Sequence, residues 1–242
     1  MQHKTQGIVL HSTPYSDRFS ITIVYTEKFG RMSYLTIRTA GRSKSQIPKA
    51  LLHPLATLDM VVEHQNLREI QRIKEVKILF PLITLTSNPV KNAIGLFIAE
   101  LFGKVVREMH PNRELFGFFL QSIRTLEETE KPCANFHLAF MLELGGYLGF
   151  TPDGESYLDG AFFDLRNGRF TALRPSHPHF LNPDDSYIFS LLIRMNYANM
   201  HVFRFLGDER RTIVEHILSY YRLHLDNFPE IKSVGVLHEV FR

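Results

Sequence analysis

The chain has 242 residues, of which 44% are hydrophobic and 12% aromatic, enough to bury a core in one large or two small domains. Its single cysteine, Cys133, excludes an intrachain disulfide and a cysteine-rich zinc site. The N-terminal residues lack the basic and apolar regions of a secretory signal, and the apolar runs are too short to span a bilayer. We therefore expect a soluble cytoplasmic protein.

The net charge of +3 conceals two segments of opposite charge. Residues 1–80 carry 12 Lys and Arg against 6 Asp and Glu, whereas residues 81–242 carry 16 against 19. No acidic residue occurs between Glu27 and Asp59. This asymmetry predicts two domains, 1–80 and 81–242, the first of which faces a polyanion. The alternative is a small domain whose surface is basic by chance.

The basic segment contains short stretches rich in β-branched residues and separated by turn signals. These stretches predict strands at residues 5–11, 19–26, 32–38, 55–63 and 67–70. Five short strands in roughly 75 residues are typical of a small antiparallel barrel. We expect a nucleic-acid-binding OB-fold, and the pattern alone also permits an SH3-like barrel.

A polar, acid-free loop is predicted between the third and fourth strands, at residues 39–49. We expect DNA phosphates to contact the basic side chains in and before this loop, namely Arg31, Arg38, Arg42, Lys44 and Lys49. Aromatic residues lie among the basic ones, and an exposed ring can stack on a base. We expect this role for Tyr34 or Phe29. The alternative is that both rings fill the barrel core.

After Pro81 the apolar residues recur at helical spacing. The spacing predicts helices at residues 89–109, 113–128, 135–148, 183–195 and 208–225. Ser87 or Asn88 is the expected cap of the first helix. An insertion at about 151–182 contains a predicted β-hairpin that turns on Asn167-Gly168, followed by a loop at 174–180. The expected fold class is α+β: a five-stranded OB-fold barrel, then a mainly α-helical domain with a small hairpin insertion.

Catalytic signatures do not occur in the sequence, which has no phosphate-binding loop, dinucleotide-binding loop, nucleophile elbow or HExxH motif. Cys133 has no basic partner nearby that would orient it as a nucleophile. His177 and His179, with Asp184 nearby, are the best local candidates for a metal site, but a third spaced histidine is missing. We expect no enzyme activity, no cofactor and no metal. A hydrolase that uses this loop is the alternative.

An ordered series of short motifs resembles the RecO family, the bacterial recombination mediators of DNA repair. In the barrel segment the motifs are residues 5–11, 15–17, 25–31, 41–44 and 49–55. In the helical segment they are residues 98–101, 114–116, 136–139, 146–150, 220–225 and 233–241. The series covers nearly the whole chain.

The resemblance implies an OB-fold followed by a helical domain. It implies binding of single- and double-stranded DNA, annealing of complementary strands, and help in loading recombinase onto coated single strands. The implied partners are the ring-forming RecR protein and the C-terminal tail of single-stranded-DNA-binding protein. Many family members carry a cysteine-based zinc module, whereas residues 151–174 of this chain contain no cysteine. We therefore expect a zinc-less branch of the family.

For the helical domain we expect an apolar pocket that binds a short acidic peptide ending in a hydrophobic residue. Its expected cations and walls are Lys104, Arg107, Arg124, Lys131, Phe136 and Leu138. Family members often have a basic residue at the start of the helix at 136, where this chain has Ala134, Asn135 and His137. The alternatives are that the apolar residues are ordinary core, and that the whole chain is a protein-binding adaptor with no DNA role.

Overall fold

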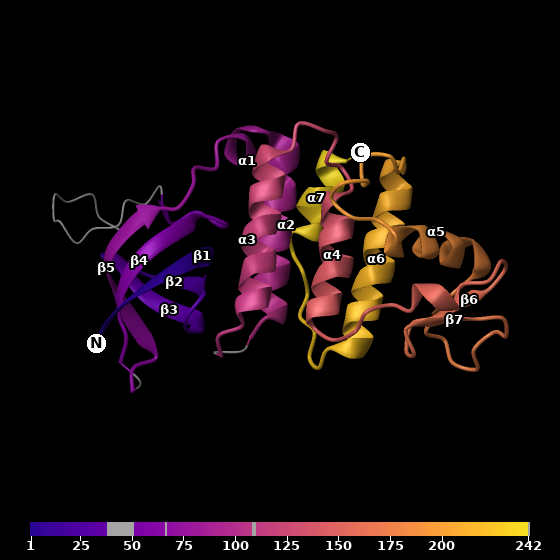
Figure 1. Cartoon of the computed structure of the whole chain (residues 1–242), viewed down its shortest axis with the longest axis horizontal. Coiled ribbons are helices and arrows are strands. Elements are labelled where there is room, and N and C mark those ends of the chain that lie inside the picture. Colours follow the sequence, from indigo (N-terminus) through magenta and orange to yellow (C-terminus); the bar gives the residue numbers. More distant parts are fainter. Residues whose placement is uncertain (38–50, 66, 108–109, 242) are drawn as a thin grey trace. The chain divides into compact units, whose positions relative to one another are not determined.

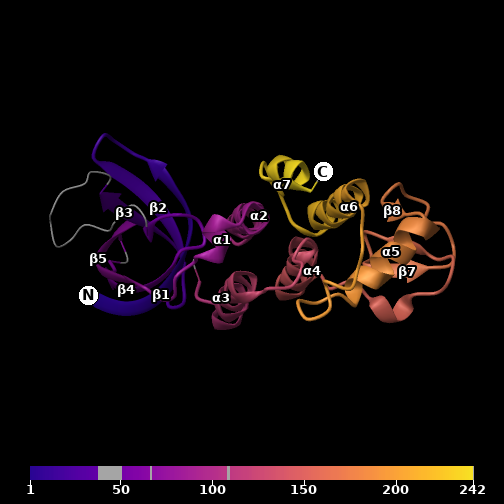
Figure 2. The same cartoon turned by 90° about the horizontal axis from the view of Figure 1, so that it is seen from above.

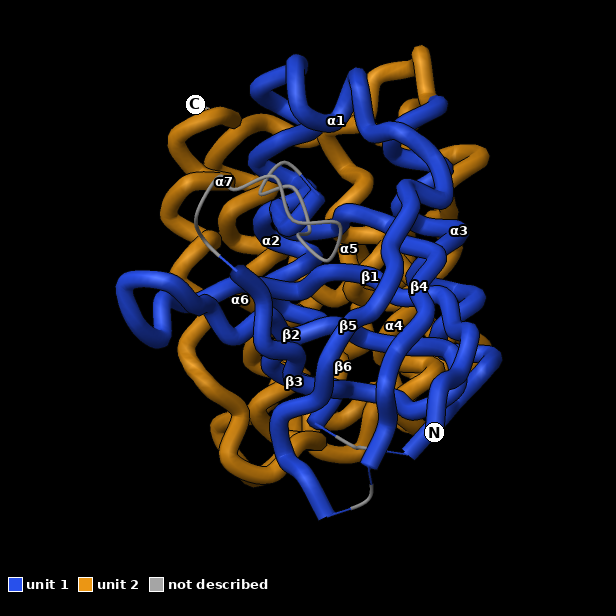
Figure 3. Tube along the Cα trace, turned by 90° about the vertical axis from the view of Figure 1, so that its left-hand side faces the viewer, with its two compact units in different colours: residues 1–128 blue, residues 129–242 orange. Residues whose placement is uncertain are grey.

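The computed structural model describes residues 1–37, 51–65, 67–107 and 110–241 (Figure 1). Contacts between residues divide the chain into two compact units, Met1–Glu128 and Thr129–Arg242, which Figure 3 colours separately. We call them unit 1 and unit 2. Within the described ranges, no helix is long and apolar enough to cross a membrane.

Unit 1 begins with a closed five-stranded barrel of order β1-β2-β3-β5-β4. Neighbouring strands are antiparallel except β3 and β5, which pair in parallel and close the barrel. This topology is that of an OB-fold, so the predicted fold is confirmed and the SH3-like alternative is not needed. The strands are β1 (Gln2–Pro14), β2 (Phe19–Thr26), β3 (Gly30–Ile37), β4 (Thr57–Glu63) and β5 (Ile70–Ile78).

The barrel core is formed by side chains that alternate along the strands, because successive residues of a strand point to opposite faces. Val9, Val24, Tyr34, Leu58 and Val62 are fully buried in it. β-Bulges in β1 and β5 interrupt the register and help these strands curve around the core.

The fifth strand differs from the prediction at 67–70. It runs instead over Ile70–Ile78, and Leu67 lies fully exposed in the turn before it. In this strand, buried Gln71 and Ile73 alternate with the exposed, charged Arg72 and Lys74. The charged face makes the segment polar as a whole, so its strand character is weak in the sequence.

In the described part of unit 1, three α-helices follow the barrel: α1 (Thr84–Ser87), α2 (Pro89–Val105) and α3 (Arg113–Glu128). The expected cap of α2 is confirmed, since Asn88 Oδ1 accepts hydrogen bonds from the backbone N–H groups of Val90 (2.9 Å) and Lys91 (3.2 Å). α2 packs on β1. The domain boundary predicted at residue 80 falls inside unit 1, between the barrel and its first helices.

Among its described residues, unit 2 contains four α-helices and a small sheet of order β7-β6-β8. Figure 2 labels the helices as α4 to α7. The hairpin predicted at Asn167-Gly168 is confirmed, and Gly168 has the positive φ (64°) that its turn requires. The loop predicted at 174–180 ends in a further short strand that pairs with β6. The elements are α4 (Phe136–Tyr147), a 3₁₀ turn (Gly154–Ser156), β6 (Phe162–Asp164), β7 (Arg169–Thr171), β8 (Phe180–Leu181), α5 (Pro183–Ile193), α6 (Gly207–His224) and α7 (Val234–Val240).

Candidate nucleic-acid interface

A cavity of about 490 Å³ lies in unit 1 beside β3, and its described lining residues are rich in basic side chains. Among the described residues that line it, Lys28, Arg31, Arg68 and Arg107 are basic and Glu69 alone is acidic. We call this cavity the basic pocket. Arg31 was expected to bind DNA, whereas Lys28 and Arg68, which lie in the turns before β3 and β5, were not predicted to do so.

The barrel topology brings these side chains together. The parallel pairing of β3 with β5 places Ser33 opposite Ile70, so the turn before β5, with Arg68 and Glu69, lies next to the pocket-lining residues of β3. Arg107 follows the C-terminal end of α2. OB-folds use the face of their second and third strands, together with the loop between the fourth and fifth, to bind oligonucleotides. The basic pocket occupies this part of the barrel.

The pocket favours an anion on electrostatic grounds. Partial burial lowers the pKa of the Arg31 guanidinium, and the positive charge of Arg107 lowers it further. The pKa of His11 is lowered by burial and by the charge of Arg31. Because these shifts include repulsion between like charges, a phosphate placed among the guanidinium groups would relieve that repulsion. The Arg107 Nε donates a hydrogen bond to the backbone O of Lys104 (3.1 Å), which fixes part of its side chain.

Two aromatic rings line the same pocket. The rings of Phe29 and His64 are stacked, with their centroids 4.3 Å apart and an angle of 15° between their planes. The ring of His3 meets the Phe29 ring edge to face, with a centroid distance of 5.5 Å. Phe29 is partly buried against the barrel core. Stacked rings next to basic groups are the combination with which single-stranded nucleic acids are bound.

The structure contradicts the stacking role expected for Tyr34. Its side chain points into the barrel, where it is fully buried, and burial raises the pKa of its hydroxyl. Phe29, the other residue for which base stacking was predicted, lines the pocket. Arg38, Arg42, Lys44 and Lys49 lie outside the described residues, so their predicted phosphate contacts stay predictions.

The residues expected to form a peptide pocket are distributed over both units. In unit 1, Lys104 Nζ pairs with Glu100 Oε1 at 2.6 Å, and the guanidinium of Arg124 lies over the Phe80 ring at 4.9 Å. Arg107 lines the basic pocket instead. In unit 2, Lys131 is exposed, and Phe136 and Leu138 are fully buried.

Phe136 and Leu138 are therefore core residues and not walls of an open pocket. The ring of Phe136 stacks on that of Tyr197, with centroids 4.5 Å apart. Both side chains belong to a very apolar helix, and a helix that is apolar on all sides is normally buried in the core. The sequence pattern showed an apolar helix and could not show whether part of it was open to a ligand.

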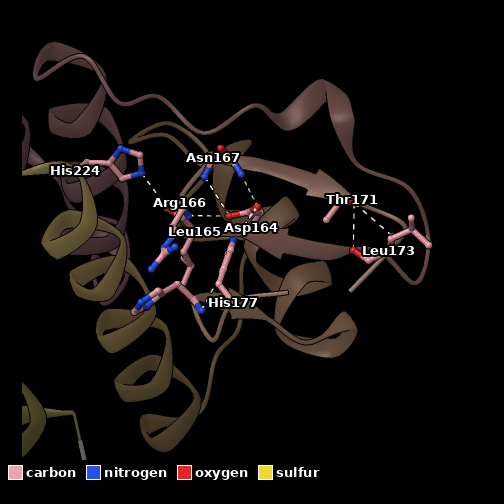
Figure 4. A network of polar contacts seen from close by, with 9 residues as sticks. Asp164, Leu165, Arg166, Asn167, Thr171, Leu173, His177 and His224 are labelled. Atoms are coloured by element: carbon pink, nitrogen blue, oxygen red, sulfur yellow. Dashed lines mark hydrogen bonds and ion pairs between the residues drawn. The ribbon is translucent and has the colours of Figure 1, made fainter. Parts of the chain in front are cut away.

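The loop that carries His177 and His179 contacts Asp164, which holds the turn between β6 and β7 (Figure 4). Asp164 accepts hydrogen bonds from the backbone N–H groups of Arg166 and Asn167 and from the Asn167 side chain, at 2.7–3.1 Å. His177 Nε2 lies 3.3 Å from Asp164 Oδ2, and the backbone N–H of His179 donates to His177 Nδ1. These hydrogen bonds lower the pKa of Asp164 despite its partial burial.

Asp184, the third member of the proposed hydrolase site, lies in the first turn of α5, and His177 pairs with Asp164 instead. Among the residues that the structure describes, no group of three His, Cys, Asp or Glu side chains could hold a metal ion.

Comparison with known proteins gives the same relatives for both halves of the chain. The domain described as recombination protein O, N terminal, matches residues 1–82, and recombination protein O, C terminal, matches residues 86–233. A DNA repair protein RecO from Azobacteroides pseudotrichonymphae is 45% identical, with 100% of both chains covered. Proteins of the same description from Phocaeicola vulgatus and Porphyromonas gingivalis are 39% and 37% identical, with 100% and 98% of both chains covered.

Proposed function

Since the chain belongs to the recombination protein O family of DNA repair proteins, we propose that it binds single- and double-stranded DNA and anneals complementary strands during recombinational repair. In this role it assists the loading of recombinase onto coated single strands. The observation that carries the proposal is the basic pocket, where Arg31, Arg107 and the Phe29–His64 stack meet on the ligand face of an OB-fold.

Annealing requires two polyanions to approach each other, and the cost of that approach is electrostatic. Arg31, Arg107 and the other basic side chains of unit 1 lower it by neutralising phosphates and releasing condensed counterions. Phosphate contacts carry no sequence information, which suits a repair factor that acts at any site of damage. The proposal requires no covalent chemistry, no cofactor and no metal.

We extend the proposal to partners and location. The family suggests a RecR-type protein and the acidic C-terminal tail of single-stranded-DNA-binding protein as partners. Because Phe136 and Leu138 are buried, the tail would need a surface other than the pocket predicted around them. The proposed location is the cytoplasm, on the nucleoid, where these partners and DNA occur together.

Equilibrium binding of the purified chain to fluorescent oligonucleotides tests the DNA role. We expect both single strands and duplexes to bind, with an affinity that falls as salt rises. Arg31→Ala should weaken both interactions, and Arg169→Ala, which removes an exposed arginine of β7 in unit 2, is the matched control. If neither form of DNA binds at low salt, the chain is the adaptor of the rival hypothesis.

A further inference from the structure

We infer that the basic pocket holds one unpaired nucleotide of a single strand, with its base against the Phe29–His64 stack and its phosphate on Arg31 and Arg107. The inference rests on the proposed DNA-binding function and makes it more specific. A groove that follows the backbone would treat all phosphates alike, whereas this site selects a nucleotide whose base has left the stack.

The size of the pocket fits this ligand. Its volume of about 490 Å³ falls within the range of about 300–1,000 Å³ that is usual for sites binding a small molecule. A base within a duplex is paired and stacked, so it can enter such a cavity only after it is extruded, which costs a few kcal/mol. An unpaired base enters without that cost. The pocket therefore favours single strands over duplexes.

The pocket also has the two chemical surfaces that a nucleotide needs. Phe29, His64 and the fully exposed Leu67 offer aromatic and apolar atoms, on which any base can stack. Arg31 and Arg107 offer two guanidinium groups, which bind phosphate oxygens in a bidentate manner. Stacking makes no distinction among the four bases, so the site agrees with a factor that acts on any sequence.

Hydrogen bonds hold the aromatic wall in place before a ligand arrives. The backbone N–H of Phe29 donates to the Thr26 hydroxyl at 3.1 Å, and the same hydroxyl donates to Gly30 O at 2.9 Å. Gln65, which follows His64, is held by buried Gln71, whose side chain exchanges two hydrogen bonds of 2.9 Å with the Gln65 backbone. A wall fixed in this way loses little conformational entropy when a base stacks on it.

The test compares two ligands that have the same backbone: an oligothymidine strand and a strand of equal length whose sites are all abasic. We expect the wild-type chain to bind oligothymidine about 5- to 150-fold more tightly, the range for one stacked base. Phe29→Leu should reduce this preference, because it removes one ring of the stack, and leave the affinity for the abasic strand unchanged. Leucine keeps most of the apolar volume that Phe29 packs against the core, and circular dichroism checks the fold. Arg31→Ala should weaken binding of both strands.

Tyr187→Leu is the matched control, because Tyr187 is a half-exposed aromatic residue of α5 that does not line the pocket. It should leave the preference intact. Equal binding of the two strands by the wild-type chain, or an unchanged preference in Phe29→Leu, would overturn the nucleotide site while the backbone interaction stands. Failure of the wild-type chain to bind either strand would overturn the DNA-binding function together with the inference.

Discussion

The ring of Tyr25 on β2 meets the ring of Phe102 on α2 edge to face, with their centroids 4.9 Å apart. Both side chains are buried, and the Phe102 ring also stacks on that of Phe119 in α3, at 3.8 Å. The outer face of the barrel, opposite the core around Val24, therefore packs on the first helices through buried aromatic rings. This packing explains why contacts group residues 1–128 into one unit. It also places the end of α2, and with it Arg107, beside the barrel.

Removal of the Phe102 ring should destabilise the protein strongly. We expect Phe102→Ala to lower the free energy of unfolding by about 3–5 kcal/mol, because it removes buried contacts to both β2 and α3 and leaves a cavity. Leu96→Ala is the control on the same helix, since Leu96 is more than one-third exposed and should cost far less. Denaturant unfolding measures both. A loss below about 1 kcal/mol for Phe102→Ala would contradict this packing of α2 between the barrel and α3.

Arg31 and Arg107 should contribute to the salt dependence of DNA binding. Each phosphate contact on a single strand contributes about −0.7 to the slope of log affinity against log salt. Because both guanidinium groups bind the phosphate of the same nucleotide, the double variant Arg31→Ala/Arg107→Ala should make the slope shallower by about 0.7. A salt titration of fluorescence anisotropy measures it. An unchanged slope would show that neither guanidinium contacts a phosphate.

The basic residues predicted in the loop at 39–49, which lie outside the described residues, allow a separate prediction. The triple variant Arg42→Ala/Lys44→Ala/Lys49→Ala should weaken DNA binding and make the single-strand slope shallower by about 2, one increment for each cation removed. The same titration applies. If the triple variant binds like the wild type at every salt concentration, the phosphate contacts lie elsewhere on the barrel.

Stability should fall in mild acid because of His137. Complete burial, with smaller contributions from the charges of Arg210 and His238, lowers the pKa of this imidazole to about 3, against about 6.5 in the unfolded chain. Between these values the unfolded state binds the extra proton, so stability present above pH 6.5 is lost as the pH falls toward 3. The contribution is up to about 1.4 kcal/mol per pH unit.

Substitution of His137 isolates this contribution. His137→Phe keeps a planar ring next to Phe241, whose ring stacks on that of His137 with a centroid distance of 5.6 Å. Denaturant unfolding between pH 4 and 6.5 should show a shallower pH dependence for the variant, by about one proton. The buried histidine would not be the source if the wild type and the variant lose stability in parallel.

The elements that the sequence predicted well are those with a strong local pattern. β2 was predicted at its observed bounds because apolar residues alternate along it, and α3 because its apolar residues recur at helical spacing. The fifth strand was predicted at 67–70, ahead of its observed position at Ile70–Ile78, because the charged face of β5 hides the alternation. The alternation of side chains along a strand defines two faces, but it does not show which face is buried in the core. That ambiguity explains why Tyr34 was assigned to DNA when it belongs to the core.

The basic pocket could not be predicted from local sequence patterns, for a different reason. Its side chains come from β3, from the turn before β5 and from the segment after α2, and these join only through the non-local pairing of β3 with β5 and the packing of α2 on the barrel. Arg107 was assigned from the sequence to a peptide pocket as one of the cations of the helical segment, within the helix predicted at 89–109, whereas α2 ends at Val105. A motif search of one segment at a time cannot find such a convergence.

The rate of annealing of complementary oligonucleotides tests the central claim most directly. The measurement compares the wild-type chain, the Arg31→Ala/Arg107→Ala variant and the Arg169→Ala control, with free strands and with strands coated by single-stranded-DNA-binding protein. We predict that the wild type and the control accelerate annealing and that the double variant loses most of the acceleration at moderate salt. Acceleration by the double variant equal to that of the wild type would contradict the assignment of annealing to the basic pocket.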